Sequence, residues 1–217
     1  MKQNELNKII ENHQHYLNED IDGWETMKAD LSYRNLSGLD LRNVNLYRVN
    51  LRNANLRSAD LRKANLRNAN LRNAALRNAN LRNADLRNAD FRKANLINAD
   101  LRKAALRNAD LAYADLREAD LIDANLSNTD LREANLSNAD LSKADLNNAD
   151  LGNADLSEAN LYRANLRNAD LREANLSNAD LSGAYISEDT KIDYPIACPE
   201  TGSFIGYKKA IYGYIVK

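Results

Sequence analysis

Residues 51–75 read LRNANLRSADLRKANLRNANLRNAA, which is five copies of one five-residue unit. The same spacing holds from Leu31 to Leu181, where 30 of the 31 positions are Leu and the remaining one is Phe91. The residue two places earlier is Ala in 26 of these units, and the residue directly before is Asp in 16 and Asn in 13. The unit is therefore Ala, then Asp or Asn, then Leu, then two variable positions. A repeat this regular decides the fold.

A period of five residues fits neither regular secondary structure. On an α-helix each step of five turns the side chain about 140° beyond a full turn, so the Leu side chains would spiral around every face. On a strand the side chains alternate, so successive Leu would point to opposite sides. A chain that turns after every unit instead places each Leu inside, with the Ala also inside and the Asp or Asn between them outside. The last two positions then form a corner, and Asn, which tolerates turn conformations, occupies the second of them 15 times.

With these units from Ala29 to about Ser187, the chain resembles the pentapeptide-repeat family. The resemblance implies an all-β solenoid, a right-handed quadrilateral β-helix in which four units complete one coil. The array from Leu31 to Ile186 would then make about eight coils, stacked about 4.8 Å apart into a shaft roughly 35–40 Å long. One coil cannot bury enough surface to stand alone, so stability is expected to come from stacking between coils.

The N-terminal segment, residues 1–28, is predicted to be a short helical cap. Its apolar residues recur at helical spacing between Asn4 and about Leu17. The positions concerned are Leu6, Ile9, Ile10, His13 and Leu17. An open solenoid exposes apolar side chains and unpaired backbone at its end, and a helix there would cover both.

The repeat domain is expected to span residues 29–187, followed by a non-repeat segment over residues 188–217. This last segment is predicted to be a C-terminal cap or a truncated extra domain. Residues 198–205, CPETGSFI, resemble the start of a small C-terminal domain that follows the array in some bacterial and phage members of the family.

The composition excludes several classes of protein. The 30 basic and 31 acidic residues nearly cancel, so the whole chain is neither a basic DNA-binding protein nor an acidic tail. One cysteine, Cys198, excludes a disulfide framework, and the two histidines, His13 and His15, leave little for a metal centre. No signal-peptide core and no apolar run of membrane-spanning length is present. We expect a cytoplasmic bacterial protein that is not an enzyme, with no catalytic residues, cofactor, metal, membrane association or small-molecule substrate.

The charges divide the repeats into two halves. Residues 41–110 contain 16 Lys or Arg and 5 Asp or Glu, whereas residues 111–190 contain 6 and 16. If the coils stack in order, the rod has a basic half of net charge +11 and an acidic half of net charge −10. Arg fills 12 of the 14 first corner positions from 42 to 107, and a coil of four units would stack many of them in ladders. The predicted ladders are Arg42, Arg62, Arg82 and Arg102; Arg52, Arg72 and Arg92; and Arg67, Arg87 and Arg107.

Two interpretations of these ladders stay open. Like charges in neighbouring coils repel, so a bound anion or an acidic partner would relieve them. Tandem duplication would equally copy the Arg residues without any role in binding, since exposed charges contribute little to stability. Nucleic acid is the less expected partner, because few aromatic residues accompany the Arg side chains and the acidic half would repel a polyanion.

The acidic half suggests another kind of partner. Some members of the family resemble duplex DNA in size and negative surface, bind type II topoisomerases such as gyrase, and protect them from fluoroquinolones. In this chain the acidic partner surface would consist of Asp140, Asp145, Asp150 and Asp155, on four successive sides of the coil. The positive charge of the neighbouring half argues against this role. The primary prediction is a structural or interaction rod that binds a protein partner or a second copy of itself, with topoisomerase binding and anion binding as alternatives.

Overall fold

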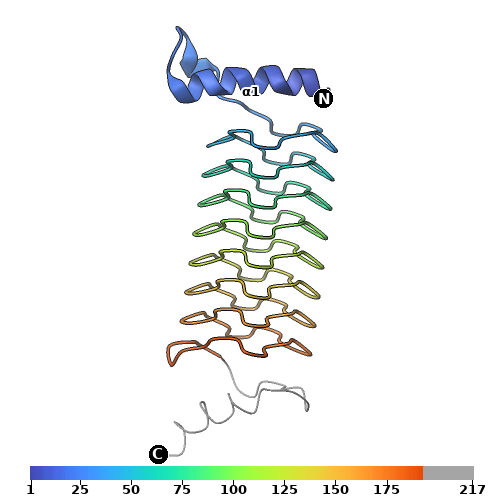
Figure 1. The fold of residues 1–217 in the computed structure, drawn as a ribbon, viewed down its shortest axis with the longest axis vertical. Coiled ribbons are helices and arrows are strands. Elements are labelled where there is room, and N and C mark those ends of the chain that lie inside the picture. Colours follow the sequence, from blue (N-terminus) through green and yellow to red (C-terminus); the bar gives the residue numbers. More distant parts are fainter. Residues whose placement is uncertain (193–217) are drawn as a thin grey trace, which may run out of the picture.

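A stack of repeated coils, with one helix lying across its N-terminal end, makes up the structure (Figure 1). This computed structural model describes residues 1–192, and the tail predicted beyond them, including Cys198, lies outside the described residues. Two helical elements precede the coils: α1, Gln3–Asn18, and the 3-10 helix η1, Trp24–Thr26.

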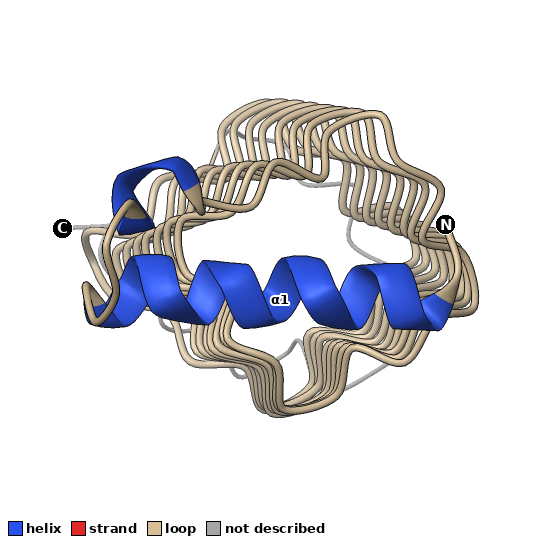
Figure 2. Cartoon of the chain, turned by 90° about the horizontal axis from the view of Figure 1, so that it is seen from above, coloured by secondary structure: helices blue, strands red, loops and turns tan. Residues whose placement is uncertain are grey.

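Parallel backbone pairing defines the coil. Isolated β-bridges join the Asp or Asn position of each unit to that of the fourth unit after it, from Asp30 with Asn50 to Asn165 with Tyr185. Four units therefore complete one turn, and units on the same side of the coil lie above one another, as the view along the rod shows (Figure 2). The last bridge joins Asp170 to Lys191, whereas the regular spacing of 20 residues would pair Asp170 with Thr190, so the chain accommodates one extra residue before Lys191.

The sides of the coil are short, as a chain that turns after every unit predicts. Within residues 1–192 the pairing consists of single bridges, and no strand of several residues forms. The cause is the turn that closes each unit, in which the Leu carbonyl accepts a hydrogen bond from the N–H three residues later, as from Ala54 to Leu51 (3.0 Å). Neighbouring coils are joined by further backbone bonds, such as the Leu51 N–H donating to the Asn70 carbonyl (2.8 Å).

The second corner residue of each unit has a left-handed backbone conformation. Its φ is 57° at both Asn53 and Asn73, and positive φ recurs at this position in every unit from Tyr33 to Gly183. A β-turn with positive φ at its third residue alone is a type II turn. Asn and Gly adopt this conformation most readily, which explains the frequent Asn predicted to suit the corner.

Leu and Ala side chains fill the interior, as the alternation of the repeat predicts. The repeat Leu residues from Leu31 to Leu166 are at most 1% exposed, and Phe91 is fully buried in the same column. The Ala residues two places earlier are nearly as inaccessible, at 1% for Ala54 and 0% for Ala169. Burying one Leu stabilises the fold by about 1.5–3 kcal/mol. The core therefore extends along the whole stack as one continuous cluster.

Helix α1 packs on the first coil and replaces the hydrogen bonds that a preceding coil would make. Leu6 is fully buried in the same core as Leu31. The Gln3 side-chain amide donates to the Asp40 carbonyl (3.0 Å), and its oxygen accepts a bond from the Asp40 N–H (3.0 Å). The Met1 amino group donates to the Asn35 carbonyl (3.1 Å). The helix predicted from Asn4 to about Leu17 is confirmed, with its bounds one residue further out at each end.

Candidate interaction surfaces

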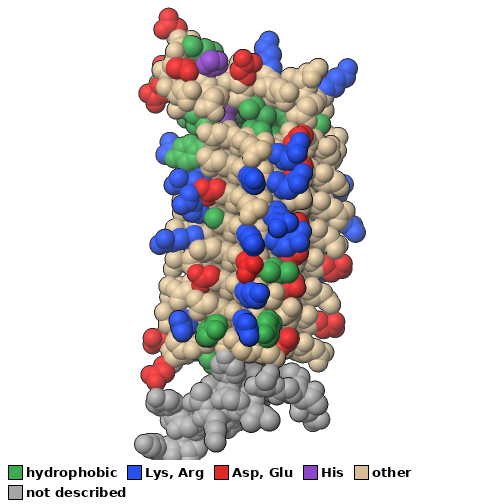
Figure 3. Space-filling model, viewed as in Figure 1, with side chains coloured by type: hydrophobic (Ala, Val, Ile, Leu, Met, Phe, Trp, Pro, Cys, Tyr) green, Lys and Arg blue, Asp and Glu red, His purple; other side chains and the backbone are tan. Residues whose placement is uncertain are grey.

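The corner Arg residues stack in columns, as a coil of four units predicts. The N–H of Asn53 donates to the Arg72 carbonyl (3.0 Å) and that of Asn73 to the Arg92 carbonyl (3.0 Å), which places successive corners above one another. Equivalent bonds stack the two other predicted ladders, Arg42, Arg62, Arg82 and Arg102, and Arg67, Arg87 and Arg107. On the fourth side the structure adds a column, with Arg57 and Arg77, that the sequence analysis did not identify. On the face drawn in Figure 3, Lys and Arg are most frequent over the N-terminal half of the coils.

The residue two places before each corner Arg decides whether the guanidinium is paired. Where that residue is Asp, its carboxylate accepts hydrogen bonds from the Arg, as Asp60 does from Arg62 Nε (2.8 Å). Five of the 12 corner Arg residues of the basic half are paired in this way: Arg42, Arg62, Arg87, Arg92 and Arg102. Where the residue is Asn or Ala, it has no carboxylate to offer. Among the described residues, the other seven corner Arg residues of the basic half therefore form no ion pair: Arg52, Arg57, Arg67, Arg72, Arg77, Arg82 and Arg107.

The paired carboxylates are held in their charged form. Hydrogen bonds from Arg42 lower the pKa of Asp40 to about 2. The pKa of Asp170 is also lowered, mainly by hydrogen bonds from Arg172. In contrast, burial and neighbouring Asp carboxylates raise the pKa of Asp110 and of Asp120, whose own corners carry Ala and Ile in place of Arg.

One corner column crosses from the basic to the acidic half, and we call it the ridge. It consists of corner residues Arg52, Arg72, Arg92, Ala112, Arg132, Gly152 and Arg172, together with the residues two places before and one place after each of them. Along its acidic part five aspartates stack in consecutive coils: Asp90, Asp110, Asp130, Asp150 and Asp170. Arg occupies only alternate corners there, so one Arg serves two carboxylates. Arg92 Nε, for example, lies 3.1 Å from Asp110 and Arg132 Nε lies 3.6 Å from Asp150.

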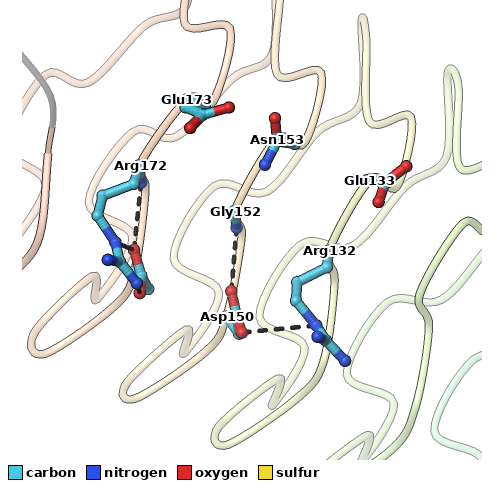
Figure 4. Close-up of a pocket in the computed structure, with 8 residues that line it drawn as sticks. Arg132, Glu133, Asp150, Gly152, Asn153, Arg172 and Glu173 are labelled. Carbon is cyan, nitrogen blue, oxygen red and sulfur yellow. Dashed lines mark hydrogen bonds and ion pairs between the residues drawn. The ribbon is translucent and has the colours of Figure 1, made fainter.

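A hollow of about 560 Å³ opens on the ridge at Gly152 (Figure 4). It exists because Gly152 has no side chain between the projecting Arg132 and Arg172. The Gly152 N–H donates to Asp150 Oδ1 (3.1 Å). The remaining lining residues are Glu133, Asn153, Asp170 and Glu173, so the hollow contains four carboxylates and two guanidinium groups.

The four predicted acidic residues lie on four successive sides of the coil, as the five-residue spacing predicts. Bridges pair Asp140 with Asp120, Asp145 with Asn125, Asp150 with Asp130, and Asp155 with Asn135, so each stands on a different side of the coil. Only Asp150 belongs to the stacked aspartates of the ridge. This column was not among the predicted sites, although Asp recurs in it at every fourth unit of the sequence.

The two histidines also lie apart. The His13 side chain of α1 is buried against the first coils. His15, also on α1, lies at the surface, with its Nδ1 2.8 Å from Asp20. Among residues 1–192 no group of three His, Cys, Asp or Glu side chains could hold a metal ion. In the same part of the chain, no helix has the length and apolar character needed to cross a membrane. The surfaces described above are suited to binding charged groups.

Known proteins similar to the chain are built from the same repeat. The family described as Pentapeptide repeats matches with eight copies, over residues 27–62, 64–102, 99–138, 119–157 and 149–187. A solved structure of HetL, a pentapeptide repeat protein involved in heterocyst differentiation regulation from the cyanobacterium Nostoc sp. strain PCC 7120, is 38% identical; the match covers 75% of this chain and 78% of HetL, with a TM-score of 0.42. A structure of QnrB1, a plasmid-mediated fluoroquinolone resistance protein, is 19% identical over 72% of this chain and 88% of QnrB1, with a TM-score of 0.48. At a stringent threshold, no curated protein matches the chain.

Proposed function

Since the chain belongs to the pentapeptide-repeat family, we propose that it is a non-enzymatic interaction rod whose basic half binds an acidic protein surface. We assign the array the right-handed quadrilateral β-helix of that family, with about eight coils, and we assign α1 the role of a cap on its N-terminal end.

The corner Arg residues that form no ion pair give this proposal its main support, although Asp85, Asp90 and Asp100 lie near enough to attract Arg67, Arg72 and Arg82. Residues 41–84 contain ten Lys or Arg and a single acidic residue, Asp60. In the coil formed by residues 65–84 all four first corner positions are Arg, and the coil contains no Asp or Glu. Five of the corner Arg residues that form no ion pair are exposed: Arg52, Arg57, Arg77, Arg82 and Arg107. A carboxylate from a partner would supply the opposite charge to these guanidinium groups.

A local acidic surface fits this arrangement better than a nucleic acid does. The unpaired Arg residues surround the rod on all four sides and cover only about two to three coils, a band roughly 10–15 Å high. A nucleic acid needs a longer basic track, and single-stranded chains also use aromatic side chains for base stacking. Within residues 41–84 the only aromatic residue is Tyr47, and its ring already lies 5.0 Å from the guanidinium of Arg48.

Binding of two labelled probes, a poly-glutamate peptide and a duplex DNA of similar charge, tests the proposal by fluorescence anisotropy. At about 50 mM salt we expect poly-glutamate to bind more tightly than DNA, and both to be released as salt rises. The variant R72A/R77A/R82A, which removes three unpaired Arg residues, should weaken poly-glutamate binding roughly tenfold or more. The matched control R87A/R92A/R102A removes three paired Arg residues and should have a smaller effect.

Two results would contradict the proposal. Tighter binding of DNA than of poly-glutamate would favour the nucleic-acid alternative. Absence of binding to either probe at low salt would remove a binding role for the basic half.

Topoisomerase binding through the acidic half is the other alternative, and the structure gives it less support. The Asp130 and Asp170 carboxylates already bind Arg132 and Arg172, which reduces the negative surface available to imitate DNA. Inhibition of gyrase supercoiling by micromolar protein would reverse this ranking.

A further inference from the structure

The ridge combines unpaired basic residues at one end with a gap in its Arg column at the other. Arg52 and Arg72 follow Asn50 and Asn70, and within residues 1–192 neither forms an ion pair. Arg52 is exposed. Further along the same column the stacked aspartates begin, with Arg on alternate corners only.

The hollow at Gly152 has the shape and charge to receive a guanidinium. The Asp150 side chain is 45% exposed, and Arg132 Nε lies 3.6 Å from its carboxylate. Arg projects at the corners directly before and after Gly152 in the column, so the hollow lies where a further Arg would stand (Figure 4). Four carboxylates and two guanidinium groups line it, which leaves a net negative charge for an incoming cation.

When two copies of the ridge run in opposite directions, the positive groups of one copy face negative groups of the other. Counted from the Asp or Asn to the second corner residue, groups 50–53, 70–73 and 90–93 each have a net charge of +1, and groups 110–113, 130–133 and 150–153 each have −1. A two-fold axis midway between Arg92 and Ala112 sets each of these positive groups opposite a negative one, whereas the outer groups 30–33 and 170–173, each with a net charge of −1, lie opposite each other. Because every coil contains the same four units, this axis brings Arg52 opposite Gly152. No other corner column of the sequence cancels group by group in this way.

We propose that the ridge is the interface of an antiparallel homodimer, in which Arg52 of each copy enters the Gly152 hollow of the other. This inference rests on the proposed function, because it takes the acidic protein surface bound by the basic half to be the acidic half of a second copy of the chain. A two-fold interface makes every contact twice, so one complementary pair of groups contributes two ion-pair clusters. Ala112 is buried next to the axis, so the exposed ring of Tyr113, with Lys93 over it, would lie at the centre of the interface.

Sedimentation velocity of the full chain at about 50 mM and about 500 mM salt tests the dimer. We expect dimers at low salt and monomers at high salt. R52E should raise the dissociation constant by roughly tenfold or more. G152R should do the same, because it fills the hollow with a guanidinium from the same chain. The variant R52E/G152K, which exchanges the charges, should restore part of the affinity.

Two matched controls carry the same changes on a neighbouring corner of the same coils. R57E and S157R should leave the dimer intact, and circular dichroism of all variants should be unchanged. A chain that is monomeric at low salt at about 100 μM would overturn the proposal. So would a dimer that tolerates G152R, or one that R57E weakens as much as R52E does.

The outcome separates this inference from the proposed function. Monomers that still bind poly-glutamate would remove the dimer and leave the interaction rod. Dimers disrupted by G152R that bind no poly-glutamate would support the ridge interface and contradict the wider binding role.

Discussion

The second corner residue of each unit has a φ near +57°, whichever amino acid occupies it. Asn tolerates this conformation, whereas other residues with a Cβ lose roughly 1–2 kcal/mol in it. Lys93, Tyr113 and Glu118 nevertheless adopt it, with φ values of 58°, 62° and 57°. Stacking against the coils on both sides therefore imposes the turn even where the local sequence disfavours it.

Replacing Asn73 with Val should destabilise the protein by about 1–2 kcal/mol, because a β-branched residue is strained at positive φ. Asn73 is exposed, so little packing changes with the substitution. The preceding corner residue, Arg72, does not have a positive φ, and R72V should have a much smaller effect. Urea unfolding measures both variants, and equal losses would show that the left-handed conformation is not the cause.

The ion pair between Arg132 and Asp130 should contribute fully to stability above the normal pKa of Asp and progressively less at lower pH. The pKa of Asp130 is lowered below 3.8, mainly by hydrogen bonds from Arg132. A lowered pKa in the folded state means that this contribution is present above pH 3.8 and is lost as the pH falls through the folded-state pKa.

R132A should therefore lower the melting temperature by roughly 1–3 °C at pH 6, and the difference from the natural sequence should shrink below pH 3.8. Thermal unfolding followed by circular dichroism measures this difference. R77A removes an Arg that has no ion pair within residues 1–192 and should leave the melting temperature nearly unchanged at both pH values. A loss in R132A that is independent of pH would assign it to packing of the side chain.

At the scale of the element, α1 is joined to the coils through a neutral histidine. His13 Nδ1 accepts a hydrogen bond from the Ala29 N–H (3.2 Å), so Nε2 carries the proton and donates to the Tyr47 carbonyl (3.1 Å). The His13 ring also stacks on Tyr16, with 5.6 Å between ring centroids. Burial lowers the pKa of His13 below 6.5, and nearby Lys28 lowers it further. Protonation of Nδ1 would remove the acceptor that holds Ala29.

Because the folded-state pKa of His13 is lowered, its contribution is complete above pH 6.5 and decreases as the pH falls toward the folded-state pKa. We expect α1 to loosen over this range. Trp24, the only tryptophan, lies 5.9 Å from the Tyr16 ring, so its fluorescence reports on the packing of α1. H13F should abolish the transition, and H15Q should retain it because His15 is bound to Asp20 outside the buried contact. A transition that survives in H13F would assign it to another group.

The sequence predicts the helix and the coil well, but not the bonds that join them. Helical spacing placed α1 within one residue of its bounds, and the five-residue period placed Leu and Ala inside. The exchange of two hydrogen bonds between Gln3 and Asp40 depends on how the helix crosses the coil, which no local pattern specifies. The sides of the coil pair through single bridges, because the turn occupies two residues of each unit.

At the scale of the whole molecule, the sequence predicted two charged halves but not the surfaces they form. Summing charge along the chain ignores which residues share a side. It also counts Arg62 and Arg82 as equal, although Asp60 neutralises the first and Asn80 offers the second no carboxylate. The ridge became visible only once the bridges between successive coils were combined with the ion pairs.

Two deletions test whether the ridge dimer requires Arg52 and Gly152 to lie on the same side of the rod. Removing residues 93–112 takes out one complete coil, so Arg52 and Gly152 stay on the same corner column. Removing residues 78–82 takes out one unit, which preserves the Leu and Ala pattern but moves everything after it to the neighbouring side. Gly152 then no longer lies above Arg52, and Ser157 takes its place on that column.

Both shortened chains should fold, because each keeps an uninterrupted array of equivalent units. Sedimentation velocity at low salt should show dimers for the deletion of residues 93–112 and monomers for the deletion of residues 78–82. The two chains have different net charges and lengths, so a third chain lacking residues 78–82 and residues 93–107 provides the control. It loses four units in all, so Gly152, Arg132 and Arg172 return to the column of Arg52 and part of the dimer should be recovered. Equal association of all three would show that long-range attraction between the halves, and not the ridge, holds the copies together.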